Sequence, residues 1–144
     1  MSTKPRKSTP VKSKSKSPPK TSQALKYEYV ELSKVALSQQ TQPVNFYGVI
    51  TDATFPYKKN ELYICSLKVI DPTLNSKNKQ DHALVVIYAT RFEDLPIVHR
   101  IGDIIRIHRA NVRVYNGKRQ FNVNMYYKSS WVLYSSDKLT PLGQ

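Results

Sequence analysis

Aromatic, basic and amide side chains alternate along residues 109–127, on both sides of the dipeptide Asn116-Gly117. Asn-Gly between two such segments is a strong signal for a β-hairpin with a type I′ turn, because both central residues of that turn need a positive φ. A two-residue turn sets the register of the flanking strands. The expected cross-strand partners are Tyr115 with Lys118, Arg113 with Gln120 and Val112 with Phe121.

Side chains of a strand point alternately to opposite faces of the sheet, so this hairpin has an apolar and a polar face. The apolar face, expected to be the core, holds Val112, Val114, Phe121, Val123 and Met125. The polar face holds Arg109, Asn111, Arg113, Tyr115, Lys118, Gln120, Asn122, Asn124 and Tyr126. Tyrosines stack on nucleobases, cations bind phosphates and amides read base edges, so the polar face suits single-stranded nucleic acid. The alternative is an ordinary polar outer face on which the tyrosines cover aliphatic stems.

The elements that must position this hairpin are short strands. Five runs rich in β-branched and aromatic residues cover 44–55, 62–70, 82–89, 103–115 and 119–127. Thr90 and Glu93 have the spacing of a capping box, and Pro96 limits that helix to a turn or two. The pattern predicts an all-β protein, a five-stranded OB-fold barrel with a short helix between strands 3 and 4. Trp131 is expected to fill the core at one end of the barrel.

The second strand and the loop before it extend the same chemistry. Alternation turns Cys65, Leu67 and Val69 inward, and turns Ile64, Ser66 and Lys68 outward. Residues 56–61 add Tyr57, Lys58 and Lys59 at a loop tip. OB-folds bind oligonucleotides over strands 2 and 3 and with the loops between strands 1 and 2 and strands 4 and 5, and both loops here combine tyrosine with basic residues.

Charge divides the chain into unequal parts. The protein has 144 residues and a net charge of +13, of which residues 1–26, with eight Lys or Arg and no acid, carry +8. We therefore predict a disordered Lys/Ser/Pro-rich tail over 1–26, an OB-fold domain over 27–137 and a C-terminal extension over 138–144. A surplus of positive charge favours polyanionic partners, nucleic acid first.

The residues that would indicate an enzyme have no catalytic arrangement in the sequence. His82, His99 and His108 lack the spacing of metal ligands, and Cys65 lies at an inward strand position. The one cysteine excludes an internal disulfide framework. We therefore expect no enzyme activity, no cofactor and no metal. The sequence has no apolar run of membrane length, so a membrane is not an expected partner.

Three stretches resemble a known family: "NFYGVITDATFPYKKNELYICSLKVIDPT", "RFEDLPIVHRIGDIIRIHRA" and "VYNGKRQFN". They are similar to the N-terminal OB domain of the alpha subunits that bind telomere ends in ciliates, within the protection-of-telomeres family. The resemblance covers roughly residues 27–137. It implies binding of G-rich telomeric single-stranded DNA, protection of chromosome 3′ ends, and a location in the nucleus at telomeres. Two further candidate partners are a telomere-binding beta subunit and a second copy of this chain.

Carried over by position, the resemblance implies DNA contacts at Tyr57, Lys58, Ser66, Lys68, Tyr115, Arg119, Gln120, Tyr126 and Tyr127. The polar face of the hairpin adds Arg113, Lys118 and Asn122. By strict alternation Arg119 and Tyr127 do not lie on that face, so a rim position or a bulge would be needed for both. The alpha subunits resemble three OB domains in series, whereas this chain holds one and is expected to be a fragment or a short paralogue. From the residues alone, single-stranded RNA binding and a protein-interaction OB domain stay open.

Overall fold

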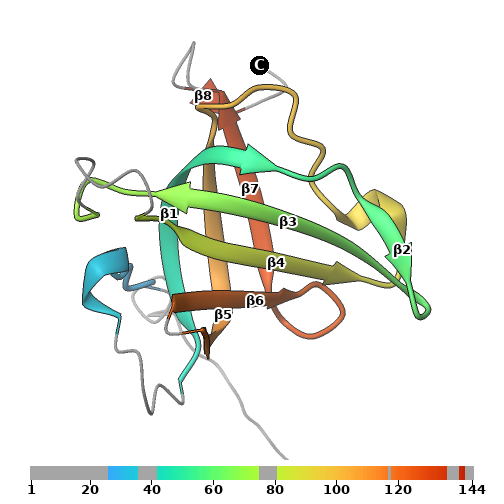
Figure 1. The fold of residues 1–144 in the computed structure, drawn as a ribbon, viewed down its shortest axis with the longest axis horizontal. Helices are drawn as coiled ribbons and strands as arrows, with labels where there is room; N and C mark the ends of the chain where they lie inside the picture. Colours follow the sequence, from blue (N-terminus) through green and yellow to red (C-terminus); the bar gives the residue numbers. More distant parts are fainter. Residues whose placement is uncertain (1–25, 36–41, 75–80, 117, 136–139, 142–144) are drawn as a thin grey trace, which may run out of the picture.

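A β-barrel forms most of the chain in the computed structural model, which describes residues 26–35, 42–74, 81–116, 118–135 and 140–141 (Figure 1). The strands are β1 (Val44–Ala53), β2 (Tyr57–Lys59), β3 (Leu62–Ile70), β4 (Ala83–Ala89), β5 (Ile104–Tyr115), β6 (Lys118–Asn124), β7 (Ser130–Ser135) and β8 (Thr140–Pro141). Two 3-10 turns are η2 (Leu32–Lys34) and η3 (Phe92–Asp94). The order β1-β3-β4-β6-β5 closes on itself through pairing of β1 with β5. The strands β4 and β6 are parallel, and the other neighbours are antiparallel.

Barrel closure depends on β1, which pairs with β5 along its first half and with β3 along its second half. Gly48 lies where the strand passes from one partner to the other. A Cβ atom at Gly48 would lie 2.9 Å from Cβ of Val69 on β3, closer than packed carbon atoms approach. The glycine therefore leaves room for the Val69 side chain to pack directly on the backbone of β1.

A bulge divides β5 into two halves with different partners. Arg109 has a φ of 62°, and the register of β1 against β5 shifts at this point. The half before the bulge pairs with β1 and β7, and the half after it pairs with β6. Bulges of this kind bend a strand and increase its twist, which lets one strand serve two parts of a barrel.

The core follows the alternation expected from the sequence. Cys65 and Val69 are fully buried and Leu67 is 1% exposed, and the rings of Phe46 and Phe121 lie with centroids 4.6 Å apart at the centre. One assignment to the core is wrong: Val114 is 46% exposed, because it lies near the tip of the β5–β6 hairpin, beyond the packed part of the barrel.

Two local predictions need correction. The Thr90 capping box does not form: Arg91 is the N-cap of η3, without a side-chain cap, and its guanidinium pairs with Asp94 at 3.2 Å. Residues 57–59 are not a loop but the strand β2, paired with β3. The expectation that Trp131 packs on the core is confirmed. This residue lies on an additional strand, β7, packs against the buried core, and donates its Nε1–H to the backbone oxygen of Asp94 at 2.9 Å.

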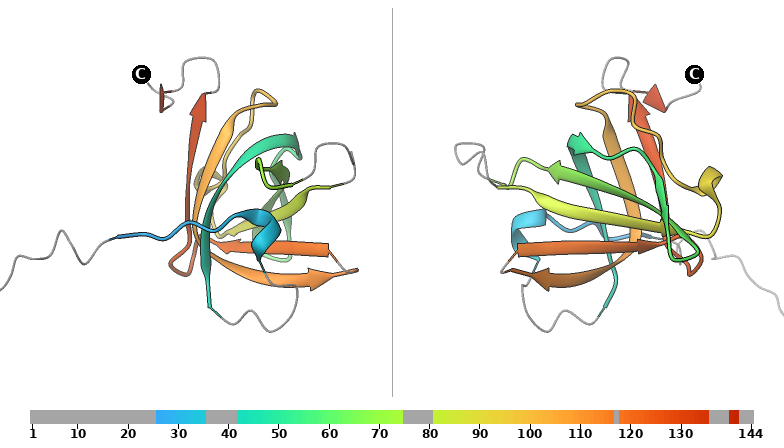
Figure 2. Two further views of the ribbon diagram at one scale, coloured as in Figure 1. Left: turned by 90° about the vertical axis from the view of Figure 1, so that its left-hand side faces the viewer. Right: turned by 45° about the vertical axis from the view of Figure 1, so that its right-hand side comes forward.

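An N-terminal segment, residues 27–35, lies across one side of the barrel (Figure 2). We call it the strap. Tyr29 forms a parallel bridge to Asn45 on β1, and the backbone nitrogen of Leu32 donates to Asp71 at 2.8 Å. The predicted disordered tail, residues 1–25 in particular, lies outside the described residues and stays a prediction. Part of the predicted C-terminal extension is described: β8, which pairs with β7.

Candidate nucleic-acid interface

The outer face of β3, β4, β6 and β5 presents side chains in cross-strand rows. The register places residues of four strands side by side, and alternation turns the same set outward. The middle row is Ser66, Val86, Asn122 and Asn111, and the row nearest the β5–β6 turn is Lys68, Leu84, Gln120 and Arg113. The third row, at the other end, is Tyr57, Ile64, Tyr88 and Asn124. We call this surface the groove face.

One end of the groove face is aromatic. Tyr57 on β2 stands opposite Ile64, which is only 9% exposed although it points outward. Tyr88 is the next residue of this row beyond Ile64, and the hydrogen bond from Met125 N to Tyr88 O at 2.8 Å brings the start of the loop with Tyr126 beside it. Burial raises the pKa of Tyr88, and the nearby Tyr126 and Tyr57 raise it further. The Tyr88 hydroxyl is therefore neutral at physiological pH. Tyrosine rings grouped in this way are suited to stacking with nucleobases.

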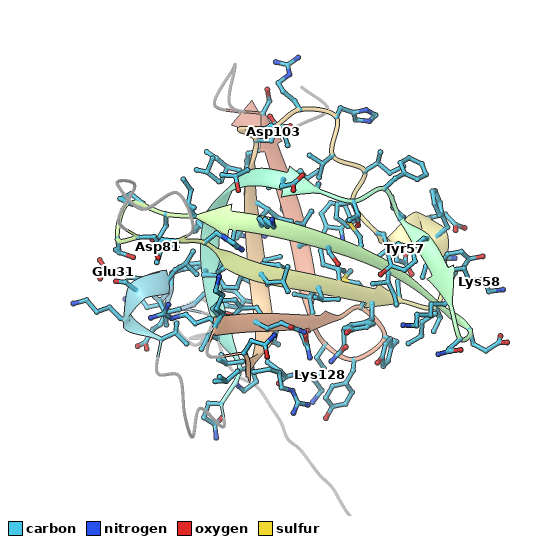
Figure 3. All side chains as sticks on the ribbon, viewed as in Figure 1. Glu31, Tyr57, Lys58, Asp81, Asp103 and Lys128 are labelled. Atoms are coloured by element: carbon cyan, nitrogen blue, oxygen red, sulfur yellow. The ribbon has the colours of Figure 1, made fainter. Side chains whose placement is uncertain are left out.

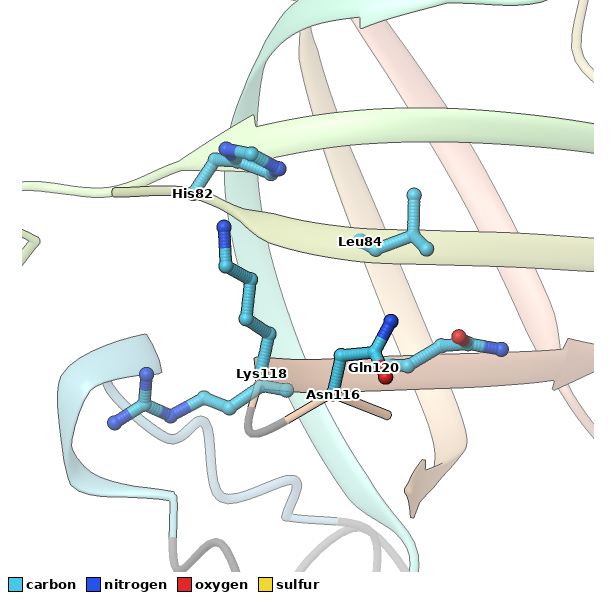
Figure 4. Close-up of a pocket in the computed structure, with 6 residues that line it drawn as sticks. His82, Leu84, Asn116, Lys118 and Gln120 are labelled. Atoms are coloured by element: carbon cyan, nitrogen blue, oxygen red, sulfur yellow. The ribbon is translucent and has the colours of Figure 1, made fainter. Parts of the chain in front are cut away.

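The other end is basic and rich in amides. His82, Leu84, Asn116, Lys118, Arg119 and Gln120 line a hollow of about 200 Å³ beside the β5–β6 turn (Figure 4). Gln120 Nε2 donates to Asn122 Oδ1 at 3.0 Å, which fixes the orientation of both amides on β6. Lys68 Nζ lies 4.0 Å from the carboxylate of Asp52, and both side chains are about half exposed or more. An exposed pair at this distance is weak, so Lys68 remains available to a phosphate.

The β2–β3 hairpin projects from the aromatic end. Its turn residues, Asn60 and Glu61, have φ of 52° and 70°, as a two-residue type I′ turn requires. Lys59 shares the outward face with Tyr57 by alternation, whereas Lys58 points to the other side, with its Nζ 5.7 Å from the centroid of the Tyr63 ring. Figure 3 shows Tyr57 and Lys58 at the same end of the molecule. Lys59 is thus better placed than Lys58 to meet a ligand on the groove face.

Arg119 lies at the rim of the groove face: it borders the hollow beside the β5–β6 turn, and its guanidinium is directed to the strap. Its Nε donates to the backbone oxygen of Val35 and its Nη2 to that of Ser33, both at 3.2 Å. A guanidinium engaged in this way connects the start of β6 to the N-terminal segment. The DNA contact expected for Arg119 stays a prediction, and its guanidinium already makes two hydrogen bonds to the strap.

The other expected contacts are distributed over the face and its edges. Tyr57, Ser66, Lys68, Arg113, Gln120 and Asn122 belong to the rows, and Lys118 shares their face. Tyr126 and Tyr127 lie in the loop after β6, 53% and 64% exposed. For Tyr115 the backbone pairing with Lys118 is as expected, while its side chain is outside what the structure describes. Tyr88 was not among the expected contacts, and alternation along 82–89 was the available signal; Lys59 was expected only as a residue of a loop tip.

The described part of the chain was also searched for a metal site, a reactive histidine and a membrane-spanning helix. It contains no group of three or more His, Cys, Asp or Glu residues that could hold a metal ion. His108 is 6% exposed and accepts or donates a 2.7 Å hydrogen bond at the hydroxyl of Tyr29, and burial lowers its pKa, so it is a neutral packing residue. Among the described residues no helix is long and apolar enough to cross a membrane.

A closed barrel of this strand order, with β4 and β6 parallel, defines the OB-fold class. The comparisons with known proteins specify the class further. Residues 23–143 match the family described as "Telomeric single stranded DNA binding POT1/CDC13". The chain therefore belongs to this family of telomeric single-strand-binding proteins.

Relatives and solved structures agree with this assignment. The chain is 56% identical over 134 residues to the telomere-binding protein subunit alpha of Stylonychia mytilus, covering 88% of this chain and 27% of that protein. It is 61% identical over 120 residues to the same subunit of Sterkiella nova, covering 78% of this chain and 24% of that one. The crystal structure of a Pot1–ssDNA complex superposes with a TM-score of 0.65 at 17% identity, over 79% of this chain and 72% of that one, which supports the fold. The chain thus spans about a quarter of the length of these alpha subunits.

Proposed function

We propose that this chain binds G-rich telomeric single-stranded DNA on the groove face and thereby helps to protect chromosome 3′ ends. The observation that carries the proposal is the arrangement of the cross-strand rows, with tyrosines at one end and lysine, arginine and glutamine at the other. Family membership supports the same ligand. The expected location is the nucleus, at telomeres.

The two ends of the groove face are expected to have different roles, base stacking at the aromatic end and base recognition at the polar end. Stacking on Tyr57, Tyr88 and Tyr126 would accept any base, because every base has a π-face. Preference for guanine needs polar groups held in fixed positions beside the stacked bases. Gln120 is such a group, since its amide is oriented by Asn122 and stands directly opposite Arg113. Arginine itself can give two parallel hydrogen bonds to guanine O6 and N7.

The experiment compares two variants on two ligands at one salt concentration. Gln120→Ala should weaken binding of a G-rich strand more than binding of oligothymidine of equal length, with about 1–3 kcal/mol of discrimination lost. Lys68→Ala is the matched control: a phosphate contact contributes equally to both ligands, so both affinities should fall by the same factor. Equal losses on both strands in Gln120→Ala would refute the reading role of this residue.

Single-stranded RNA is the main competing ligand, because stacking does not distinguish the sugars. Affinities for a G-rich DNA, the RNA of the same sequence and a scrambled DNA separate the possibilities. DNA preference with G-rich selectivity supports the proposal. Tighter RNA binding, or no binding to any of the three, would contradict it and favour an RNA-binding or a protein-interaction domain.

The basic tail is proposed to add affinity without sequence preference. Lysines in a segment of low hydrophobicity neutralise phosphates and carry no base code. Deleting residues 1–26 should therefore flatten the plot of log K against log salt by about 0.7 for each phosphate that the tail neutralises in the intact chain. An unchanged slope would separate the tail from DNA binding. A beta subunit is a further proposed partner, and pull-down of such a subunit by the chain, with and without DNA, tests it.

A further inference from the structure

The loop after β6 connects the groove face to a second group of rings and cations. The loop begins beside the aromatic end of the groove face, because the backbone nitrogen of Met125 donates to the oxygen of Tyr88 at 2.8 Å, and the exposed Tyr126 and Tyr127 follow. Lys128 Nζ lies 5.6 Å from the centroid of the Tyr127 ring. The backbone of this loop is anchored, because Met125 N donates to the oxygen of Tyr88 and Lys128 has a φ of 69°. Its side chains are therefore presented from a defined turn.

Arg109, at the bulge of β5, links this loop to the strap. Its Nη1 donates to the backbone oxygen of Lys128 at 3.2 Å, and its Nη2 donates to the hydroxyl of Tyr27 at 3.3 Å. The Tyr27 ring is stacked on His108, with centroids 4.1 Å apart and planes 18° apart, yet 41% of Tyr27 stays exposed. We call Tyr27, Arg109, Tyr127 and Lys128 the Tyr27 patch. Figure 3 places Lys128 at the lower edge of the barrel.

The patch has the chemistry of the groove face and is continuous with it. Two exposed rings, Tyr126 and Tyr127, are followed by the cations Lys128 and Arg109 and then by the ring of Tyr27. A cation–π contact and two hydrogen bonds join each of these residues to the next from Tyr127 onward. The next residue toward the N-terminus is Lys26, and residues 1–26 carry eight basic residues and no acid. A single strand that leaves the groove at its aromatic end would meet a ring, two cations and a second ring.

We infer that the Tyr27 patch is an extension of the binding path, on which a nucleotide beyond the groove stacks on Tyr27 while Arg109 and Lys128 meet its phosphates. The inference rests on the proposed function, since the same strand must first occupy the groove face. Its ligand is the flanking part of that strand. Base stacking gives it little sequence preference, because every base offers a π-face.

A length series tests the extension. Two oligonucleotides of the same sequence type, about 6 and about 12 nucleotides long, lie within the site sizes of OB-folds. The wild type should bind the longer strand more tightly. Tyr27→Ala should bind the short strand like the wild type and lose at least about fivefold on the long one, the lower limit for loss of one stacked base. Tyr47→Ala is the matched control, because Tyr47 lies on β1 with 42% exposure, outside the patch.

Each outcome has a defined meaning. A wild type that binds the short strand but gains nothing with length overturns the inference and leaves the proposed function intact. A wild type that binds neither strand overturns both. Equal losses on both lengths in Tyr27→Ala, or losses of the same size in Tyr47→Ala, overturn the inference, because they indicate a general effect on the strap or the surface.

A second measurement on the unmodified chain does not depend on how the variants fold. Photo-cross-linking with 5-iodouracil at either end of the long strand should label the tryptic peptide of residues 27–34. The same base placed at the centre of the strand should label peptides of β3 or β6 instead. Absence of label on 27–34 from both end positions would overturn the inference.

Discussion

Arg119→Ala separates a role in the fold from a role in DNA binding. The side chain makes two hydrogen bonds to backbone oxygens of the strap, one to Val35 and one to Ser33. A hydrogen bond with a charged partner contributes about 1.5–3 kcal/mol. Because the guanidinium is only partly buried, each bond should contribute less than this range, and we expect about 2 kcal/mol for the two bonds together.

The measurement is thermal unfolding followed by circular dichroism, with urea unfolding for the free energy. For a domain of about this size, 2 kcal/mol corresponds to a fall in Tm of about 8 °C. Arg119→Lys should lose most of the same stability, since an ammonium on a flexible stem cannot make both bonds in the fixed fork of a guanidinium. Arg113→Ala is the control, because Arg113 is exposed on the groove face.

DNA affinity measured well below the unfolding temperature completes the test. If Arg119 acts through the strap, Arg119→Ala should bind short G-rich strands nearly as the wild type does, whereas Arg113→Ala should bind them more weakly. An unchanged Tm together with a loss of affinity in Arg119→Ala would refute the structural role and restore Arg119 as a DNA contact.

Three further predictions concern the barrel itself. Gly48→Ala should lower the free energy of unfolding by 1–3 kcal/mol, roughly the cost of overpacking, because its Cβ would meet Val69 at 2.9 Å; unchanged urea unfolding would contradict this. Burial raises the pKa of Cys65 from 9.0 to about 11, so the free energy of unfolding should fall as pH rises from 9 to 11, and it should fall by less in Cys65→Ala. The thiol of the folded protein should react with a thiol reagent only after unfolding. Burial, and then Arg106 and Arg109, lower the pKa of His108 below its ordinary value of 6.5. The unfolded chain therefore takes up a proton at this residue more readily, and the free energy of unfolding should decline as pH falls below 6.5. An equal decline of Tm in a His108→Gln variant would refute this.

The strands and the hairpin were predictable because they depend on local pattern. Alternation of apolar residues located the five barrel strands to within a few residues, and the cross-strand partners of Arg113 and Val112 followed from the Asn-Gly turn. Strand β2 was not predicted, since its turn, Asn60-Glu61, lacks the glycine that makes such turns recognisable. The capping box failed because Pro96 and the short connection leave room for only a single 3-10 turn.

The site was predictable to the extent that one strand's alternation decides it. Gln120, Asn122 and Lys118 share a face whatever their neighbours are. Tyr88 belongs to the candidate site because β4 pairs with β3 on one side and with β6 on the other, which places Tyr88 between Ile64 and Asn124. Those partners are far from it in the sequence, and no local pattern contains them.

The sequence by itself determined the class of fold, the register of the β5–β6 hairpin and the polar character of its outer face, since each follows from residues close together in the chain. Tertiary structure alone decided that Arg119 holds the strap, that Val114 is exposed, and that Arg109 joins Tyr27 to Lys128. These features depend on contacts between residues 19 to 86 positions apart. Such contacts are set by barrel closure and by the bulge at Arg109, where the backbone departs from strict alternation and the simple rule of two faces no longer applies.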